Sequence, residues 1–82
     1  MQKHTHTFVE NYNGMVGIGF DRETDENTVI YCLQKLSDDQ LMEHLRKKLT
    51  DGELHEIFNL CMRLLKAHLT DAEYHRYFLK DE

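Results

Sequence analysis

Three six-residue stretches share one pattern: LSDDQL at residues 36–41, LTDGEL at 49–54 and LTDAEY at 69–74. Each contains a leucine, a hydroxyl residue, an aspartate, a spacer, Gln or Glu, and a large apolar residue. This order is typical of a helix start, where the hydroxyl group accepts from a backbone amide and the Gln or Glu reaches back to the cap. The unequal intervals exclude a repeat of fixed period. We therefore interpret the stretches as three helix starts, capped by Ser37, Thr50 and Thr70.

Apolar residues between and after these starts recur at the spacing of amphipathic helices. Together with a weaker start at Thr24, they predict four short helices at about residues 25–35, 38–48, 51–67 and 71–80. The first of them has the apolar stripe Val29, Ile30, Leu33 and Leu36. The third has the strongest stripe, formed by Leu54, Ile57, Phe58, Cys61, Leu64, Leu65 and His68. Leu60 and Met62 add apolar positions beside it, so we expect this third helix to be central, with the others packed around it.

The segment TFVENYNGMVGIGF, residues 7–20, differs from the helical part of the chain. Its Asn13-Gly14 dipeptide is the strongest short-range signal for a hairpin, because a type I′ turn needs positive φ at both central positions. Alternating apolar residues flank this dipeptide on both sides. We therefore predict a β-hairpin over residues 7–20, with its turn at Asn13-Gly14.

One face of this predicted hairpin carries Gly17 and Gly19, and is bare unless Phe8 and Tyr12 fold across it. A lone two-stranded hairpin is marginal in water and leaves two open edges. Two arrangements would solve this problem: the hairpin docks on the helices of its own chain, or it pairs with a second copy in a homodimer. We therefore name Phe8, Tyr12, Gly17 and Gly19 as candidate interaction residues.

The expected fold class is α+β and mainly α, in one small domain. That domain spans residues 1–82, with the hairpin at 7–20 and a helical part at 24–80. A chain of 82 residues has a modest core, and its two cysteines make no disulfide framework. No apolar run is long enough to cross a membrane, and the first residues lack the apolar stretch of a signal peptide. We therefore expect a cytoplasmic protein that does not contact a membrane.

The net charge disfavours nucleic-acid binding, and the lack of known catalytic motifs disfavours an enzyme. The net charge is −5, opposite in sign to that of a protein that neutralises many phosphates, so nucleic-acid binding is disfavoured. The only basic cluster is Arg46-Lys47-Lys48. It either stabilises the end of the predicted helix 38–48 or contacts an acidic partner, and we add it to the candidate interaction residues. No catalytic triad or nucleophile elbow is present, so we predict no enzyme and no cofactor.

Six histidines raise the question of a metal site. His4 and His6 lie near the terminus, whereas Cys61, His68 and His75 would converge only if the last helix folds back. The closely spaced ligand pairs of zinc sites are absent, so we predict no metal ligands. A metal-binding domain stays the least favoured alternative.

LTDGELHEIF, residues 49–58, followed by Arg63 and a leucine-rich helix, resembles the middle of the haemolysin-expression-modulating family over residues 33–69. The resemblance implies a small helical protein that acts by binding a nucleoid protein. That family has no N-terminal hairpin and tends to carry a C-terminal Trp, which this sequence lacks, so we transfer no site residue. We expect a small, non-enzymatic protein that acts by protein–protein interaction, with a regulatory role. A nucleic-acid-associated transcription regulator is the alternative.

Overall fold

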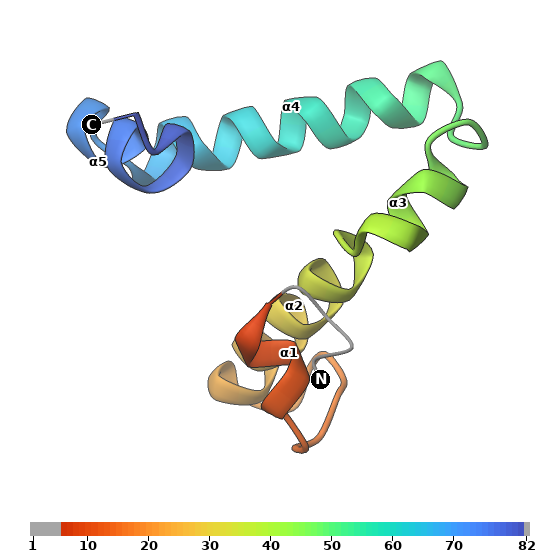
Figure 1. Ribbon diagram of the computed structural model, residues 1–82. Helices are drawn as coiled ribbons and strands as arrows, with labels where there is room; N and C mark the ends of the chain where they lie inside the picture. Colours follow the sequence, from red (N-terminus) through yellow and green to blue (C-terminus); the bar gives the residue numbers. More distant parts are fainter. Residues whose placement is uncertain (1–5, 82) are drawn as a thin grey trace. The chain divides into compact units, whose positions relative to one another are not determined.

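The computed structural model describes residues 6–81, which are mostly helical (Figure 1). The chain divides after Lys48 into two compact units, which we describe in turn. The first unit contains α1 (Thr7–Asn11), α2 (Arg22–Leu36) and α3 (Asp39–Leu45). The second contains α4 (Asp51–His68), α5 (Asp71–Glu73) and the π-helix η1 (Tyr74–Leu79). The single domain over residues 1–82 stays a prediction.

The predicted β-hairpin over residues 7–20 is wrong, and with it the α+β class. Residues 7–11 form α1, and no residue from 6 to 81 belongs to a strand. Gly14 does not take the positive φ that a type I′ turn requires, since Gly19 is the one glycine with positive φ. The local preference of Asn13-Gly14 is overridden by contacts that residues 6–19 make with a distant helix, α2.

The N-terminal segment, residues 6–19, lies along one face of α2 and runs opposite to it in chain direction. As the segment proceeds from residue 6 to residue 19, its contacts on α2 move toward the N-terminus of the helix by about one turn at each step. The pairs are His6 with Ser37, Val9 with Gln34, Tyr12 with Tyr31, Gly17 with Thr28, and Gly19 with Asp25. Residues three apart are neighbours on a helix surface, each step turning about 60° around it, so Asp25, Thr28, Tyr31 and Gln34 form one continuous strip that winds over one side of α2, which we call the docking face.

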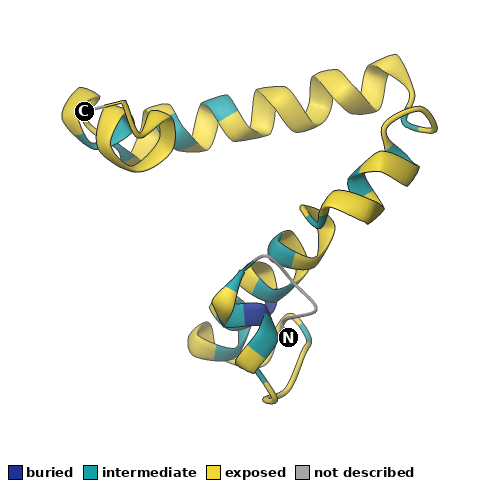
Figure 2. Cartoon of the chain, viewed as in Figure 1, coloured by how far each residue is buried: buried dark blue, intermediate teal, exposed yellow. Residues whose placement is uncertain are grey.

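This docking face holds the most buried part of the described chain. Val9 is the one buried apolar residue in residues 6–81, at 5% exposure, and Thr28 is the one buried polar residue (Figure 2). The Val9 amide donates to Gln34 Oε1 at 3.0 Å. The ring of Tyr12 stacks on Phe8 at 5.2 Å and meets Tyr31 edge-on at 5.9 Å. Aromatic packing and polar contacts to side chains thus hold α1 on α2.

The apolar stripe predicted for the first helix does not face this contact. Val29, Ile30, Leu33 and Leu36 are all exposed. The prediction that this stripe packs inward is therefore wrong. The polar face of α2 packs against the N-terminal segment instead, because its side chains accept hydrogen bonds from backbone amides that have no strand partner.

Two of the three predicted helix starts are confirmed in detail. Thr50 Oγ1 accepts from the Glu53 amide at 3.1 Å while Glu53 Oε1 accepts from the Thr50 amide at 2.9 Å, which is a complete capping box. Thr70 and Glu73 form the same pair of bonds at the start of α5.

The third predicted cap, Ser37, is wrong. The carboxylate of Asp38, one residue later, accepts from the Gln40 and Leu41 amides and caps α3. Ser37 instead donates to the Gln34 carbonyl at the end of α2. Asp is as good an N-cap residue as Ser, so the cap of α3 lies one residue later than predicted.

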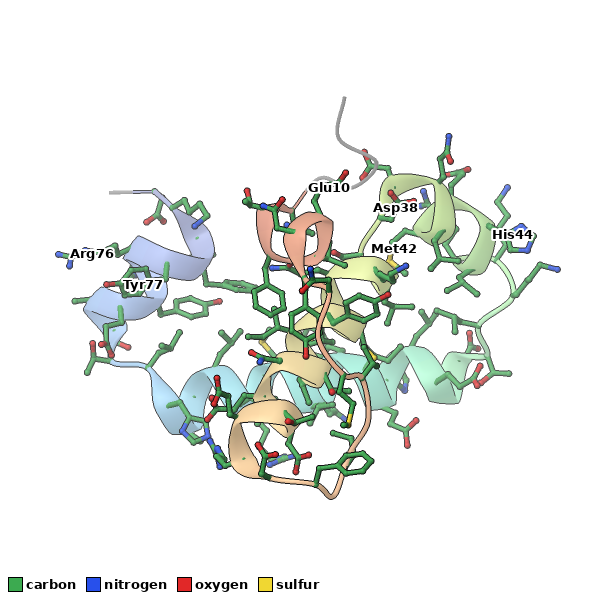
Figure 3. All side chains as sticks on the ribbon, turned by 90° about the horizontal axis from the view of Figure 1, so that it is seen from below. Glu10, Asp38, Met42, His44, Arg76 and Tyr77 are labelled. Carbon is green, nitrogen blue, oxygen red and sulfur yellow. The ribbon has the colours of Figure 1, made fainter. Side chains whose placement is uncertain are left out.

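The second unit does not contain the expected core. Within the second unit, α4 has no buried residue (Figure 2), so α5 and η1 do not supply the packing that was expected around a central third helix. Beyond α4, the short α5 continues directly into η1, where the Tyr74 and Phe78 rings stack at 5.2 Å. Arg76 and Tyr77 also lie on η1 (Figure 3), and Tyr77 is exposed. Lys80, with φ of 56°, ends this helix.

Candidate interaction site

Residues 15–20, MVGIGF, form an exposed segment that we call the apolar loop. Its four large side chains project into solvent: Met15 is 59% exposed, Val16 47%, Ile18 64% and Phe20 63%. Single exposed apolar residues are common on protein surfaces, but four within six residues form a patch that is typical of an interaction site. This loop lies within the segment that the sequence singled out through Gly17 and Gly19.

Thr28 on α2 fixes the middle of the apolar loop. Its buried hydroxyl accepts from the Gly17 amide and donates to the Gly17 carbonyl, both at 2.9 Å. A hydroxyl group can fill both roles at once, so one side chain satisfies both backbone polar groups of Gly17. The backbone is therefore held while Val16 and Ile18 on either side stay exposed.

Asp25, one turn earlier on α2, fixes the end of the loop. Its Oδ1 accepts from the Gly19 amide at 2.9 Å. Gly19 has a φ of +96°, in the left-handed region that residues with a Cβ seldom adopt. This conformation lets the chain turn between Ile18 and Phe20 without taking either side chain out of solvent.

The glycines are also required by close contacts within the loop. A Cβ on Gly17 would lie 2.5 Å from Cε2 of Phe20, so any larger residue would displace that ring. A Cβ on Gly14 would lie 2.7 Å from the Tyr12 hydroxyl, which donates to the Met15 carbonyl. The sequence left open whether Phe8 and Tyr12 cover Gly17 and Gly19; the structure places the Phe20 ring over Gly17 and the Tyr12 ring over Gly14.

Acidic residues follow the apolar loop directly. Residues 21–26 contain the acids Asp21, Glu23, Asp25 and Glu26 and one base, Arg22. Asp21 caps α2, and the amide and hydroxyl of Thr24 donate to it and hold the pKa of its carboxyl below the ordinary value. Arg22 Nε donates to Glu26 Oε2 at 2.6 Å, which raises the pKa of the guanidinium. The loop is thus bordered by a net negative rim on the first turns of α2.

A shallow hollow on α2 adjoins this acidic rim. It is lined by Arg22, Asp25, Glu26, Val29 and Ile30. These residues offer apolar contact from Val29 and Ile30 and charge from Arg22, Asp25 and Glu26. It extends the apolar loop and its rim along the side of α2 that carries Val29 and Ile30.

The basic cluster lies elsewhere in the first unit, at the end of α3. Arg46 is the C-cap residue of α3, and its Nη1 lies 3.5 Å from Glu43 Oε2 in an exposed ion pair. Lys47 and Lys48 follow in a turn, and the Lys48 amide donates to the Leu45 carbonyl at 2.8 Å. The structure therefore brings Phe8, Tyr12, Gly17 and Gly19 together on α2, but does not bring the basic cluster to them.

The histidines and cysteines do not form a cluster in the described chain. Within residues 6–81, no three His, Cys, Asp or Glu side chains come together in a way that could hold a metal ion. His75 Nδ1 lies 3.0 Å from Asp81 Oδ1, and Cys32 and Cys61 are free, exposed thiols. His4 lies outside the described residues. No helix of the described chain is long and apolar enough to span a membrane.

No protein-family model, curated protein or solved structure matches the chain. The resemblance of residues 33–69 to the haemolysin-expression-modulating family therefore receives no support.

The residues that position the loop were missed in the sequence. In the sequence, Thr28 and Asp25 are ordinary polar positions of a helix, and the apolar stripe Val29, Ile30, Leu33 and Leu36 is the stronger pattern. One signal was present: polar or amphipathic residues at 25, 28, 31 and 34 recur every three positions, which places them on one helix face.

Proposed function

We propose that this protein acts by binding another protein through the apolar loop, and that it is not an enzyme. The observation that carries the proposal is that side-chain hydrogen bonds from α2 hold the loop backbone while Met15, Val16, Ile18 and Phe20 remain exposed. A held segment loses less conformational entropy on binding than a mobile one, so fixing the loop favours association.

The charge next to the loop indicates the chemistry of the partner. Four acids and one base follow Phe20 within residues 21–26. The partner surface should therefore offer an apolar recess bordered by Lys or Arg side chains, because complementary charge raises the association rate and disfavours acidic surfaces. The same acidic rim disfavours a nucleic-acid backbone or an anionic membrane as the occupant.

The proposed setting is the cytoplasm, with a regulatory role. Cys32 and Cys61 are exposed and unpaired, and free thiols persist in reducing compartments. A chain of 82 residues that binds through one small surface fits a protein that changes the behaviour of a larger partner.

The experiment places a photo-cross-linking amino acid at position 18 of the full chain in its native cell. The matched control carries it at Gln40, an exposed polar residue of α3. We expect a discrete adduct with one other protein from position 18, and when the cross-linking is repeated in a lysate its yield should fall as added salt screens the acidic rim. Adducts of equal yield from both positions, or none from position 18, would contradict the proposal.

A further inference from the structure

The basic cluster of the first unit, Arg46-Lys47-Lys48, lies in an exposed turn directly after α3. A base near the end of a helix is favourable because the C-terminus of the helix carries a partial negative charge. This effect accounts for Arg46, the C-cap residue of α3. Lys47 and Lys48 lie beyond the helix, so the helix end does not explain the whole cluster.

The peptide bond after Lys48 coincides with the division of the chain into its two units. Before this bond, the Lys48 amide donates back to the Leu45 carbonyl at 2.8 Å. After it, Thr50 bonds forward to Glu53 in the capping box of α4. Cutting the chain after Lys48 therefore breaks none of these hydrogen bonds, and the start of α4 keeps its cap.

The backbone on either side of this bond can take the extended form in which peptides are commonly bound. Thr50 is already extended, with a φ of −73° and a ψ of 162°. α3, which precedes the turn, has seven residues and none of them is buried. So short a helix is marginal in water, and opening it exposes no buried side chain. Local unfolding at this point therefore has a low free-energy cost.

The other bases of the described chain are held in helices or, for Lys80, at the end of one: Arg22, Lys35, Arg63, Lys66, Arg76 and Lys80. A helix must open before its backbone enters a protease, so cleavage there follows the small population of the opened form. Arg63 and Lys66 lie inside α4, which has 18 residues. Lys35 lies on α2, with its ammonium 5.1 Å from the centre of the Tyr31 ring. The turn at residues 46–48 is thus the most accessible basic segment among residues 6–81.

We propose that Arg46-Lys47-Lys48 is a processing site, which an endopeptidase specific for basic residues cleaves after Lys48. The specificity pocket of such an enzyme carries a carboxylate that pairs with the Lys or Arg before the scissile bond. Water adds across the amide between Lys48 and Leu49, leaving a carboxylate on Lys48 and an ammonium group on Leu49. The acids Asp51 and Glu53 in the first turn of α4 offset the new positive charge at the helix start.

Cleavage at this site separates the apolar loop from α4. The hydrogen bonds that hold the loop, from Thr28 and Asp25, lie within residues 1–48, so the first fragment keeps that surface. The processing site uses no residue of the loop. The two proposals therefore fail separately: an uncut chain can still give the adduct at position 18, and a chain without that adduct can still be cut after Lys48.

The first test is limited digestion of the full chain with trypsin, whose specificity pocket carries the required carboxylate, followed by intact-mass spectrometry. We expect cleavage within residues 46–48 to be at least about tenfold faster than cleavage after Lys35, Arg63 or Lys66, because each of these three requires an opened helix. An equal or faster cut at any of the three helical positions would overturn the proposal.

The second test follows the full chain, tagged at both ends, in its native cell. We expect two fragments, and mass spectrometry should place the start of the second at Leu49. The triple variant Arg46→Gln, Lys47→Gln, Lys48→Gln should lose both fragments. The matched control Arg63→Gln, Lys66→Gln removes two bases from α4 and should keep them. A parent chain that stays whole in the cell, or fragments that persist in the triple variant, would overturn the proposal.

Discussion

The hydroxyl of Thr28 holds both backbone polar groups of Gly17, accepting from its amide and donating to its carbonyl at 2.9 Å each. Thr28 is buried, and the two residues lie eleven positions apart in the chain. This contact places the middle of the apolar loop on α2. Because the backbone is held there, Val16 and Ile18 stay exposed in the folded chain.

Replacing Thr28 with Val keeps the shape of the side chain and removes both hydrogen bonds. We expect the first unit to lose about 2 kcal/mol of stability, since each of the two bonds contributes about 1 kcal/mol net. Amide hydrogen exchange at Gly17 should become faster. Thr28→Ser, which keeps the hydroxyl, is the control and should retain slow exchange. Equal exchange rates in Thr28→Val and the parent would show that the bond does not form in solution.

Two Gly→Ala variants should change stability in opposite directions. Gly19→Ala forces a Cβ into the left-handed region, which costs about 1 kcal/mol or more. Gly52→Ala lies in the first turn of α4, where the nearest side-chain atom is Thr50 Oγ1 at 3.9 Å, and should gain about 0.5 kcal/mol of helix stability. Urea unfolding followed by circular dichroism measures both. A neutral Gly19→Ala would contradict the loop conformation.

The capping boxes give a further prediction. Thr50→Ala should lower the stability of the second unit by about 1 kcal/mol, because the Glu53 amide loses its acceptor. Ser37→Ala should have a much smaller effect on α3 than Asp38→Ala, since the Asp38 carboxylate accepts from the first amides of that helix. Thermal unfolding of the three variants compares them, and a larger loss from Ser37→Ala would reverse the assignment of the α3 cap.

These helix starts show what local sequence can predict here. Thr50 and Thr70 were identified correctly because a capping box is formed within four consecutive residues and needs no distant partner. Ser37 was misassigned because Asp38, its neighbour, is an equally good cap and the choice depends on where α2 ends. The end of α2 lies at Ser37, whose hydroxyl is 2.8 Å from the His6 ring, a partner 31 residues away.

The N-terminal segment shows where local prediction fails. Asn13-Gly14 favours a hairpin within its own few residues, yet Val9 bonds to Gln34 and Gly17 to Thr28. Those partners lie 25 and 11 residues away. Gly17 and Gly19 were still identified as a candidate site, since their lack of side chains matters for any close contact. The α2 side chains that hold these glycines could not be assigned from the sequence, because the packing of the N-terminal segment on α2 was not predicted.

The cap of α2 has a pH dependence with a definite sign. Hydrogen bonds from the Thr24 amide and hydroxyl favour the ionised form of Asp21 and lower its pKa in the folded chain. Its stabilising contribution is therefore present above the pKa of the unfolded chain and is lost as the pH falls through the lowered folded value. An NMR titration of the Asp21 carboxyl should give a lower midpoint in the folded chain than in a peptide of residues 18–26. Equal midpoints would contradict the cap.

The most direct test of the apolar loop uses the three isoleucines, which lie in separate elements: Ile18 in the loop, Ile30 on α2 and Ile57 on α4. The measurement is a methyl NMR spectrum of isoleucine-labelled protein, recorded while the partner captured at position 18 is added in purified form. We expect the Ile18 methyl signal to shift or broaden in proportion to the partner, while the Ile57 signal changes less. An Ile18 signal that stays unchanged at saturating partner would show that the apolar loop is not the binding surface.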